Sequence, residues 1–427
     1  MKLCNVKWFG ICLFVFLLNA CLIIQVMAQE TLTWEDCLEQ SLQKHPDLIS
    51  AKEKVKQAKA DKGIARSALF PQVTSQVSGK RAETAAKDAA DTYSCSVTGT
   101  QFLFDGFKTA ADIKSASKTI TAQEYNYIVT SSNIRLNLRS AFVTLLRAQE
   151  LISLTEEIAG RRKQNLELIQ LRYEAGREHK GALLAAQADL AQAEFEAAQA
   201  KRNLSLAQRE LIKELGWEKN FSVKAQGTFD IQEINCEKPD IESFADTTPF
   251  LRELIAKKEA ARFDYNSARL DFLPRVYASG SYGKTQSDWP PGNEEWSAGV
   301  TVSLPIFEGG GRIVQASKAK SQLKQAQAEE RSGRDSVILT LEQTWKDFQD
   351  TIDTVSVKNK FLEAAQERAK IAGAQYSQGQ ITFDDWIIIE DNLVSAKKGY
   401  LDAQADLLIA EANWIQAKGG TLEYVQK

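Results

Sequence analysis

The sequence has few of the residues from which catalytic and metal sites are usually built. It contains two histidines, His45 and His179, and neither has a cysteine or carboxylate partner at the spacing of a metal site. A serine elbow, a paired catalytic motif and a metal signature are all missing from the sequence. We therefore expect that the protein is not an enzyme and binds no cofactor or metal, and we interpret His45 as a surface residue at a helix start.

The sequence also lacks an excess of positive charge and an even set of cysteines. Its 53 Lys and Arg stand against 56 Asp and Glu, and because nucleic-acid binding needs a basic stripe, we expect no nucleic-acid partner. Cys37, Cys95 and Cys236 follow residue 28, and an odd number cannot be fully paired within one chain. A Cys37–Cys236 bridge and free buried thiols are both open interpretations.

Long apolar runs are absent after residue 28. Residues 1–28 hold two lysines, an apolar core and a small-residue ending, which predicts a secretory signal peptide cut after Ala28. A lipoprotein cut before Cys21 and a retained transmembrane helix are the alternatives. Because no later run reaches about 18 apolar residues, a second membrane-spanning helix is not available. If the mature chain crosses a bilayer, it must do so as a closed β-barrel.

What the chain does contain is a repeat at an offset of 203 residues. Self-similarity in one register predicts a single supersecondary unit that is used twice. The matched pairs are Pro46 and Pro249, Arg66 and Arg269, Pro71 and Pro274, Gly106 and Gly309, Tyr173 and Tyr376, Gly176 and Gly379, and Leu190 and Leu393. We assign residues 1–28 to the signal peptide, 29–215 to the first repeat, 216–240 to a linker or equatorial segment, 241–418 to the second repeat and 419–427 to a C-terminal tail.

Each repeat is predicted to begin with a helix and a β-hairpin. Helical patterns over residues 34–69 and 241–273 meet Pro71 and Pro274, and proline ends a helix and starts extended chain. Alternation then predicts hairpins at 71–105 and 274–308, with polar loops at 80–93 and 284–295, one apolar face and one small or hydroxylated face. Strands of about 9–11 residues suit a membrane-spanning strand, and an ordinary soluble hairpin is the alternative.

Two long stretches without proline follow the hairpins. Lys108–Ala175 and Arg312–Gln378 predict helices of about 100 Å, long enough for coiled-coil packing. Gly176 and Gly379 come next and suit left-handed helix caps, after which a return helix is expected in each repeat.

The stretch "LPIFEGGGR" (304–312) has the order of a nucleotide site, with a strand-like run, glycines and then a helix. Neither it nor its counterpart "FLFDGFK" (102–108) has the GK[ST] ending that a phosphate-binding loop needs. We interpret the glycines instead as hinges between strand and helix, because glycine permits the torsions of such a junction. The predicted hinge residues are Pro71, Gly106, Pro274, Gly309, Gly310 and Gly311.

The strings "LPIFEGGGR", "FLPRVYASGSYG", "RYEAG", "QADLAQAE" and "YSQGQITFDDW" together resemble the TolC family of outer-membrane efflux proteins. The resemblance covers essentially the whole mature chain. It implies a mainly α fold with transmembrane β, in which a duplicated unit of coiled-coil helices and a β-hairpin forms a trimeric 12-stranded β-barrel on an α-helical barrel. Independently, four strands cannot close a barrel and eight leave an interior that side chains nearly fill, so a pore needs at least three chains.

The resemblance also implies a function. It predicts an outer-membrane exit duct of a tripartite efflux pump, a homotrimer in contact with outer-membrane lipid that passively conducts small molecules from the periplasm to the exterior. Its partners would be a periplasmic adaptor and an inner-membrane transporter, and its helical part would lie in the periplasm. The alternatives are an exit duct for type I protein secretion or metal efflux, and a soluble periplasmic coiled-coil scaffold.

The resemblance finally implies site residues at the ends of the long helices. Family members place two aspartates one turn apart after the second tip; Asp385 matches the first, whereas Ile388 occupies the second position and Asp384 points about 100° away around a helix. We expect Asp385, with Asp384, at a periplasmic entrance where an acidic ring favours cations. A helix-start aspartate stabilised by the dipole is the alternative. The implied adaptor contacts are Tyr173, Gly176, Arg177, Tyr376, Gly379 and Ile381.

Overall fold

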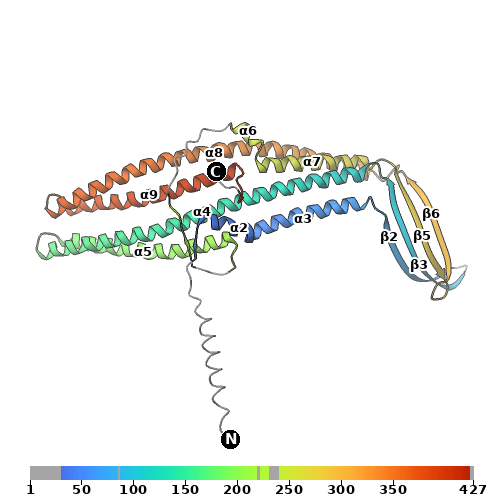
Figure 1. Cartoon of the computed structure of the whole chain (residues 1–427), viewed down its shortest axis with the longest axis horizontal. Helices are drawn as coiled ribbons and strands as arrows, with labels where there is room; N and C mark the ends of the chain where they lie inside the picture. The colour runs from blue at the N-terminus through green and yellow to red at the C-terminus, as the bar shows by residue number, and fades with distance from the viewer. Residues whose placement is uncertain (1–29, 85–86, 219–221, 230–239, 424–427) are drawn as a thin grey trace, which may run out of the picture.

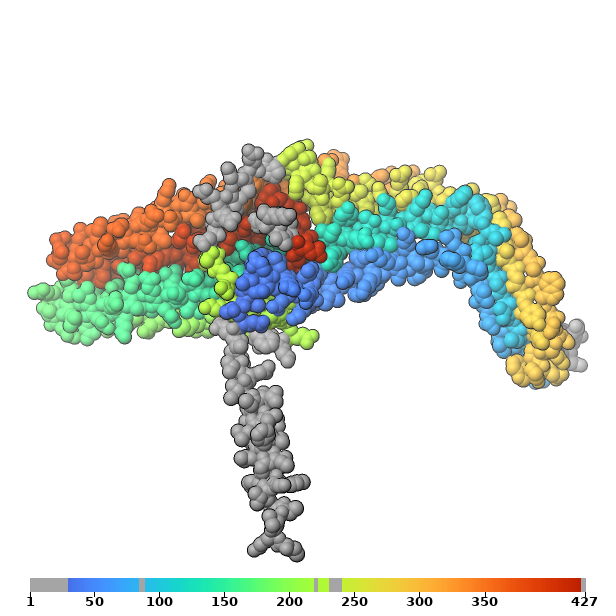
Figure 2. Space-filling view, viewed as in Figure 1, coloured from blue at the N-terminus to red at the C-terminus, as the bar shows by residue number. Residues whose placement is uncertain are grey.

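The computed structural model describes residues 30–84, 87–218, 222–229 and 240–423. The molecule is elongated, with a sheet at one end, two helical hairpins at the other and long helices between them (Figure 1). The space-filling view shows the sheet end bending away from the line of the helices (Figure 2). None of the helices in these described ranges combines the length and the apolar character needed to cross a membrane. The predicted signal peptide and Cys236 lie outside the described residues.

The same succession of elements appears in both halves of the chain. Helices α4 and α8 each run for 67 residues and begin 203 residues apart, and α3 and α7 each run for 22. In chain order the elements are β1 (Glu30–Leu32), α2 (Trp34–Lys44), α3 (Pro46–Ser67), β2 (Gln72–Thr84), β3 (Lys87–Phe104), α4 (Lys108–Glu174), α5 (Lys180–Leu215), β4 (Val223–Ala225), α6 (Ile241–Ala245), α7 (Pro249–Leu270), β5 (Arg275–Gln286), β6 (Asn293–Ser303), α8 (Gly311–Ser377) and α9 (Phe383–Ala417).

The first helical stretch is two helices rather than the single one predicted from residue 34 to 69. His45 precedes Pro46, and a residue in that position avoids the helical region; it is extended, at φ −65° and ψ 123°. His45 then caps α3, because its Nδ1 accepts a hydrogen bond from the Asp47 N–H at 3.2 Å. The second stretch, predicted from 241 to 273, is divided in the same way into α6 and α7 before Pro249.

His45 is 6 % exposed, so the interpretation of it as a surface residue was wrong. Because Nδ1 accepts a hydrogen bond, a neutral His45 carries its proton on Nε2, which lies 3.7 Å from Glu214 Oε2 on α5. This contact, together with Lys213, holds the pKa of the Glu214 carboxyl below its ordinary value despite burial. The imidazole therefore joins α3 to α5 at the centre of the molecule.

The central core lies where the first half of the chain folds back on itself. Residues of α2, α4 and α5 pack there against the short parallel pair β1 and β4. Cys37 is fully buried in this core as a free thiol, and Leu422 of the tail packs into it. Strand β4 lies in the segment predicted to link the two repeats.

The sheet is a four-stranded antiparallel sheet in the order β2-β3-β5-β6. Its first three strands are longer than predicted, and residues 80–84 and 87–93 of the expected loop are strand. Backbone pairing does not require apolar side chains, and the opposite charges of Arg81 and Asp91 face each other across the ladder at 3.8 Å. The expected loop at 284–295 is likewise partly strand at both ends, where Lys284 pairs with Glu294.

Strand β6 ends at Ser303 and does not reach residue 308 as predicted. The reason is Pro305, which has no N–H to donate to a ladder and restricts the residue before it. Residues 304–310 are therefore a connector between the sheet and α8 rather than part of the sheet.

The two faces of the sheet have different chemistry, which confirms the predicted alternation. The register places Trp296 opposite Tyr282 and Val302 opposite Val276 on one face, and Trp296 is 78 % exposed. On the other face, hydroxyls pair across strands, as in the 2.8 Å Oγ contact between Ser281 and Ser297. We call the first one the apolar face, and its members include Val73, Val77, Cys95, Val97, Val276, Tyr282, Trp296, Val300 and Val302.

Four helices continue the order of the strands. Helix α3 packs on α4, α4 on α7 and α7 on α8, so α4 and α7 lie in the middle and α3 and α8 at the edges. Towards the far end, α5 pairs with α4 and α9 with α8, which gives two helical hairpins (Figure 1).

Gly106→Ala should destabilise the protein more than Gly309→Ala. Both glycines have positive φ, 69° and 61°, so each alanine costs about 1–2 kcal/mol of backbone strain. Only at Gly106 would the new Cβ also lie 2.7 Å from Leu273 Cβ, which adds roughly 1–3 kcal/mol of overpacking. Thermal unfolding of the two purified variants, followed by circular dichroism, measures the difference. Equal losses of melting temperature would mean that overpacking against Leu273 does not add to the cost of Gly106→Ala.

Candidate functional site

The residues singled out from the sequence gather at two places, at opposite ends of the long helices. We call them the junction, between sheet and helices, and the tip, where the helical hairpins turn. The junction contains Pro71, Gly106, Pro274, Gly309, Gly310 and Gly311, and the tip contains Tyr173, Gly176, Arg177, Tyr376, Gly379, Ile381, Asp384 and Asp385.

At the junction, the chain passes through two consecutive left-handed residues before each long helix. They are Gly309 and Gly310 before α8, at φ 61° and 80°, and Gly106 and Phe107 before α4, at 69° and 64°. Phe107 therefore takes a conformation that costs a non-glycine residue about 1–2 kcal/mol. Gly311 is already the first helical residue of α8 and has no positive φ, so the junction does not need its conformational freedom.

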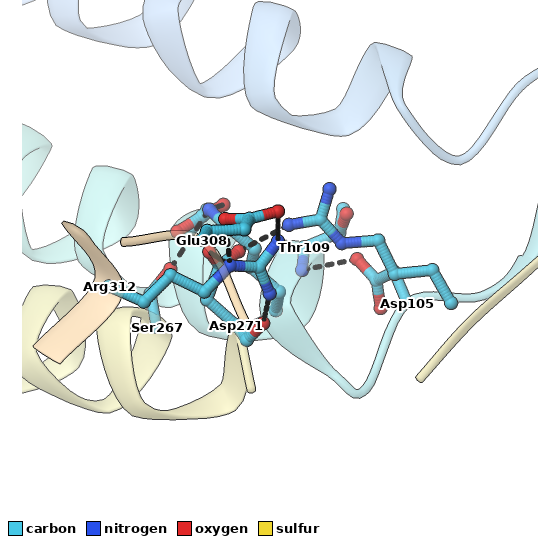
Figure 3. Close-up of polar contacts among 9 residues, drawn as sticks. Asp105, Thr109, Ser267, Asp271, Glu308 and Arg312 are labelled. Carbon is cyan, nitrogen blue, oxygen red and sulfur yellow. Dashed lines mark hydrogen bonds and ion pairs between the residues drawn. The ribbon is translucent and has the colours of Figure 1, made fainter. Parts of the chain in front are cut away.

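Arg312 holds the second junction together. Its guanidinium donates to both carboxylate oxygens of Glu308, at 2.7 and 3.2 Å, and to the backbone carbonyl of Asp271, the C-cap of α7 (Figure 3). Arg275 of β5 in turn donates to the Asp271 carboxylate. A bidentate guanidinium contact of this kind fixes direction as well as distance, so α7, α8 and β5 are tied at one point.

The first junction is held by different groups. The Asp105 carboxylate accepts a hydrogen bond from the Thr109 N–H at 2.6 Å (Figure 3). Lys108 Nζ lies 3.2 Å from Asp112 Oδ2 and 3.3 Å from Ser267 Oγ on α7. Sequence reasoning missed these polar residues and Arg312, although the four-residue spacing of Glu308 and Arg312 was a signal that could have pointed to a pair.

At the tip, glycine ends both long helices as predicted. Gly176 and Gly379 have φ of 68° and 77°. In each turn the residue after the glycine donates its N–H to a carbonyl of the last helical turn. Arg177 donates to the Arg172 carbonyl at 2.8 Å, and Gln380 donates to the Gln375 carbonyl at 2.9 Å. This is the six-residue hydrogen bond of a Schellman cap.

Tyr376 joins the two hairpins. Its ring is 1 % exposed and stacks on Trp386, with centroids 4.4 Å apart at 11°. Its hydroxyl donates to Glu178 Oε2 at 2.8 Å, and Arg172 donates to its carbonyl at 3.0 Å while lying over its ring at 4.6 Å. Burial, followed by the contact with Glu178, raises the pKa of Tyr376. We call these four residues the Tyr376 cluster.

The other tip residues differ in accessibility. Tyr173, Gly176, Arg177 and Gly379 are exposed, whereas Ile381 is half-buried against the apolar core at the tip, which includes Ile169, Tyr376 and Phe383. We expected Tyr376 to contact an adaptor, but its side chain is buried in this protomer and presents no surface to a partner. Arg172, Glu178 and Trp386 were missed by sequence reasoning, because nothing local indicates that the two tips meet.

Asp385 lies at the start of α9, where Thr382 caps the helix. The Asp385 N–H donates to Thr382 Oγ1 at 3.2 Å, and that hydroxyl donates to the Asp385 carboxylate at 2.6 Å. Both Asp385 and its neighbour Asp384 are exposed, and neither has an ion-pair partner within the described part of the chain. The Asp385 carboxylate therefore lies at a helix start, where the helix dipole can stabilise it, and it is also open to solvent.

Above the tip, ion pairs connect α4 to α9. Arg161 lies 2.8 Å from Glu390, and Arg162 pairs with Asp391. Lys397 and Glu157, at 2.6 Å, form a further pair. In the ranges that the structure describes, no group of His, Cys, Asp and Glu side chains could hold a metal ion.

Comparison with known proteins decides the family. The sequence profile described as "Outer membrane efflux protein" matches residues 37–217 and 241–420, most of the chain. The chain belongs to the outer membrane efflux protein family. This confirms the resemblance to the TolC family that the sequence indicated.

Relatives of this outer membrane efflux protein match it over most of its length. Outer membrane efflux protein BepC of Brucella suis biovar 1 (strain 1330) is 23 % identical over 402 residues, which are 92 % of this chain and 86 % of BepC. Outer membrane protein TolC of Escherichia coli (strain K12) is 22 % identical over 355 residues, 77 % of this chain and 69 % of TolC. The CmeC outer membrane channel of Campylobacter jejuni has the same fold, with a TM-score of 0.83 and 18 % identity over 91 % of this chain and 86 % of CmeC.

Membership of the outer membrane efflux protein family gives the location. The protein resides in the outer membrane with its helical part in the periplasm, as predicted. BepC is named as an efflux protein and CmeC as a channel, and neither is named as an enzyme.

Tyr376→Phe in this outer membrane efflux protein should loosen the tip without unfolding the molecule. The ring can still stack on Trp386, but the Glu178 carboxylate loses its hydroxyl partner, at a cost of about 1–3 kcal/mol. We expect faster amide hydrogen exchange in the two tip turns and unchanged exchange at the central core. Tyr173→Phe, at an exposed tip position, is the matched control. Indistinguishable exchange in the two variants would show that the Glu178 hydrogen bond does not hold the hairpins together.

Proposed function

We propose that the protein is the outer-membrane exit duct of a tripartite efflux pump, which passively conducts small molecules from the periplasm to the exterior. The observation that carries this proposal is the direct attachment of a sheet with one exposed apolar face to helices of 67 residues, about 100 Å long. A sheet of this kind meets lipid on its apolar face, and helices of this length extend far into the periplasm.

The proposed assembly is a homotrimer. The four-stranded sheet has two open edges, β2 and β6, and unpaired edges require partners. Three copies would supply twelve strands, with the apolar faces outside against outer-membrane lipid and the hydroxylated faces inside around water. The helices follow the order of the strands, so the same assembly would place an α-helical barrel below the β-barrel.

We also propose that the two halves are repeats of one unit, over residues 29–215 and 241–418. Support comes from the equal lengths of α4 and α8 and from the two separate ranges, 37–217 and 241–420, that the family profile matches. Residues 1–28 would be removed as a signal peptide, residues 216–240 would connect the repeats at the equator, and residues 419–427 would form the C-terminal tail.

The tip is the proposed contact for a periplasmic adaptor, which would connect the duct to an inner-membrane transporter. The exposed positions Tyr173, Gly176, Arg177 and Gly379 would supply the surface, with Ile381 at its edge. Tyr376 would support this surface from inside by fixing one hairpin against the other. The duct itself performs no chemistry in this proposal, and the energised partner determines which molecules are exported.

Val300→Lys should prevent assembly in the outer membrane, whereas Thr301→Lys should not. Val300 lies on the apolar face, where a lysine at mid-membrane costs about 2–4 kcal/mol in each copy. Thr301 is the next residue and belongs to the opposite, water-facing side of the sheet. The measurement is the detergent-corrected mass of protein extracted from outer membranes, with three protomers expected for the wild type and Thr301→Lys. A wild-type monomer that is extracted without detergent would overturn the duct.

Asp385→Asn should lower the preference of the reconstituted duct for cations, because Asp385 is proposed to contribute a carboxylate to an acidic ring at the periplasmic entrance. Asp384→Asn is measured in parallel and should lower the cation preference less, since its carboxylate points about 100° away around the same helix. Single-channel conductance and ion selectivity in planar bilayers provide the measurement. If Asp385→Asn leaves both unchanged, the carboxylate serves only as a helix-start residue.

A further inference from the structure

A groove of about 620 Å³ lies between α4 and α7 beside the junction, and the proposed duct function does not use it. Its volume falls in the range of ligand sites, roughly 300–1,000 Å³. We call it the α4–α7 groove, and its walls include Phe107, Lys114, Phe263, Arg269, Leu270 and Leu273. No Asp or Glu belongs to its lining.

The groove changes from apolar to cationic along its length. Phe107 and Leu273 lie at the end next to the sheet, and Phe107 is 66 % exposed. Lys114 follows Phe107 by seven residues on α4, which places it about 10 Å further from the sheet. Arg269 on α7 lies four residues before Leu273, so it also lies further from the sheet than the apolar end of the groove. A ligand that fits has an apolar part towards the membrane and an anionic part towards the periplasm.

The two cations of the groove are Lys114 and Arg269. Among the described residues, neither Lys114 nor Arg269 forms an ion pair, whereas Lys118, one turn along α4, is paired with a carboxylate of α7. Their charges lie near aromatic rings instead, Lys114 at 5.9 Å from the Phe263 centroid and Arg269 at 5.8 Å from that of Tyr265. Unneutralised cations beside an apolar wall favour an amphipathic anion.

The groove is continuous with the apolar face of the sheet. A register shift in β3 between Phe102 and Phe104 places Phe104 opposite Val276, a member of that face. The ring of Phe104 makes an edge contact with the ring of Phe107, with centroids 5.3 Å apart. The apolar end of the groove therefore lies on the side of the molecule that would meet lipid.

A second copy of the chain would not need to cover the groove. The neighbouring copies would dock on the edge strands β2 and β6 and on the edge helices α3 and α8. Helices α4 and α7 lie in the middle of the protomer, so the groove between them stays open in such an assembly.

We propose that the α4–α7 groove binds a glycerophospholipid of the periplasmic leaflet, with its phosphate between Lys114 and Arg269 and its acyl chains along Phe107, Leu270 and Leu273. The inference rests on the proposed contact of the apolar face with lipid. A phospholipid in this position would set the depth of the junction in the membrane, because its headgroup lies at a known level of the bilayer.

The test is native mass spectrometry of the full-length protein, extracted from outer membranes in mild detergent and washed extensively. The wild type should retain about one phospholipid per chain. The double variant Lys114→Glu, Arg269→Glu should reduce the retained phospholipid by about tenfold or more, because both attractive charges become repulsive. The double variant Arg262→Glu, Lys320→Glu makes the same charge change at exposed positions outside the groove lining and should retain the lipid.

Equal retention in the two double variants would overturn the site, as would a retained molecule with the mass of lipid A. If the charge-reversed protein does not assemble, Lys114→Gln with Arg269→Gln is measured in its place, and undiminished retention there also contradicts the proposal. The experiment distinguishes failure of the proposed function from failure of the lipid site. A protein that is extracted without detergent would contradict the lipid-facing sheet itself, whereas a detergent-dependent trimer that retains no phospholipid would contradict only the groove.

Discussion

The structure depends on how the backbone turns from sheet to helix at the junction. Each long helix begins after two consecutive left-handed residues, and a helix of 67 residues turns any change of angle at its start into a large displacement at its tip. Glycine makes this turn without strain before α8. Before α4, Phe107 makes the same turn, and Leu273 leaves no room for a side chain at Gly106.

Polar contacts at the junction then fix the direction of the helices. Arg312 ties the start of α8 to the end of α7, and Lys108 ties α4 to the same helix. The Tyr376 cluster repeats this arrangement at the other end, where it joins the two hairpins. The long helices are therefore constrained at both ends, while their middle is held by the central core.

Some features were predictable because their signal is local. Gly176 ends a helix through its own backbone properties, and alternation along β6 assigns Trp296 and Val302 to one face. Pro305 carries a local signal of the same kind, although the predicted hairpin ran past it to residue 308. Other features were not, because they depend on pairing. The polar stretch at 80–93 gives no apolar signal, yet most of it is strand, since its backbone groups pair across the hairpin. His45 was assigned to the surface because one helix start does not indicate that α5 covers it.

By itself, the sequence determined the order of helices and hairpins, the extent of the two long helices, the left-handed glycine turns and the two faces of the sheet, because each follows from the local properties of successive residues. Only the tertiary structure decided which side chains meet. Tyr376 reaches Glu178 across 198 residues, and Lys118 has a partner carboxylate whereas Lys114 has none among the described residues. Such contacts depend on how distant helices pack, and neighbouring residues in the chain carry no information about that packing.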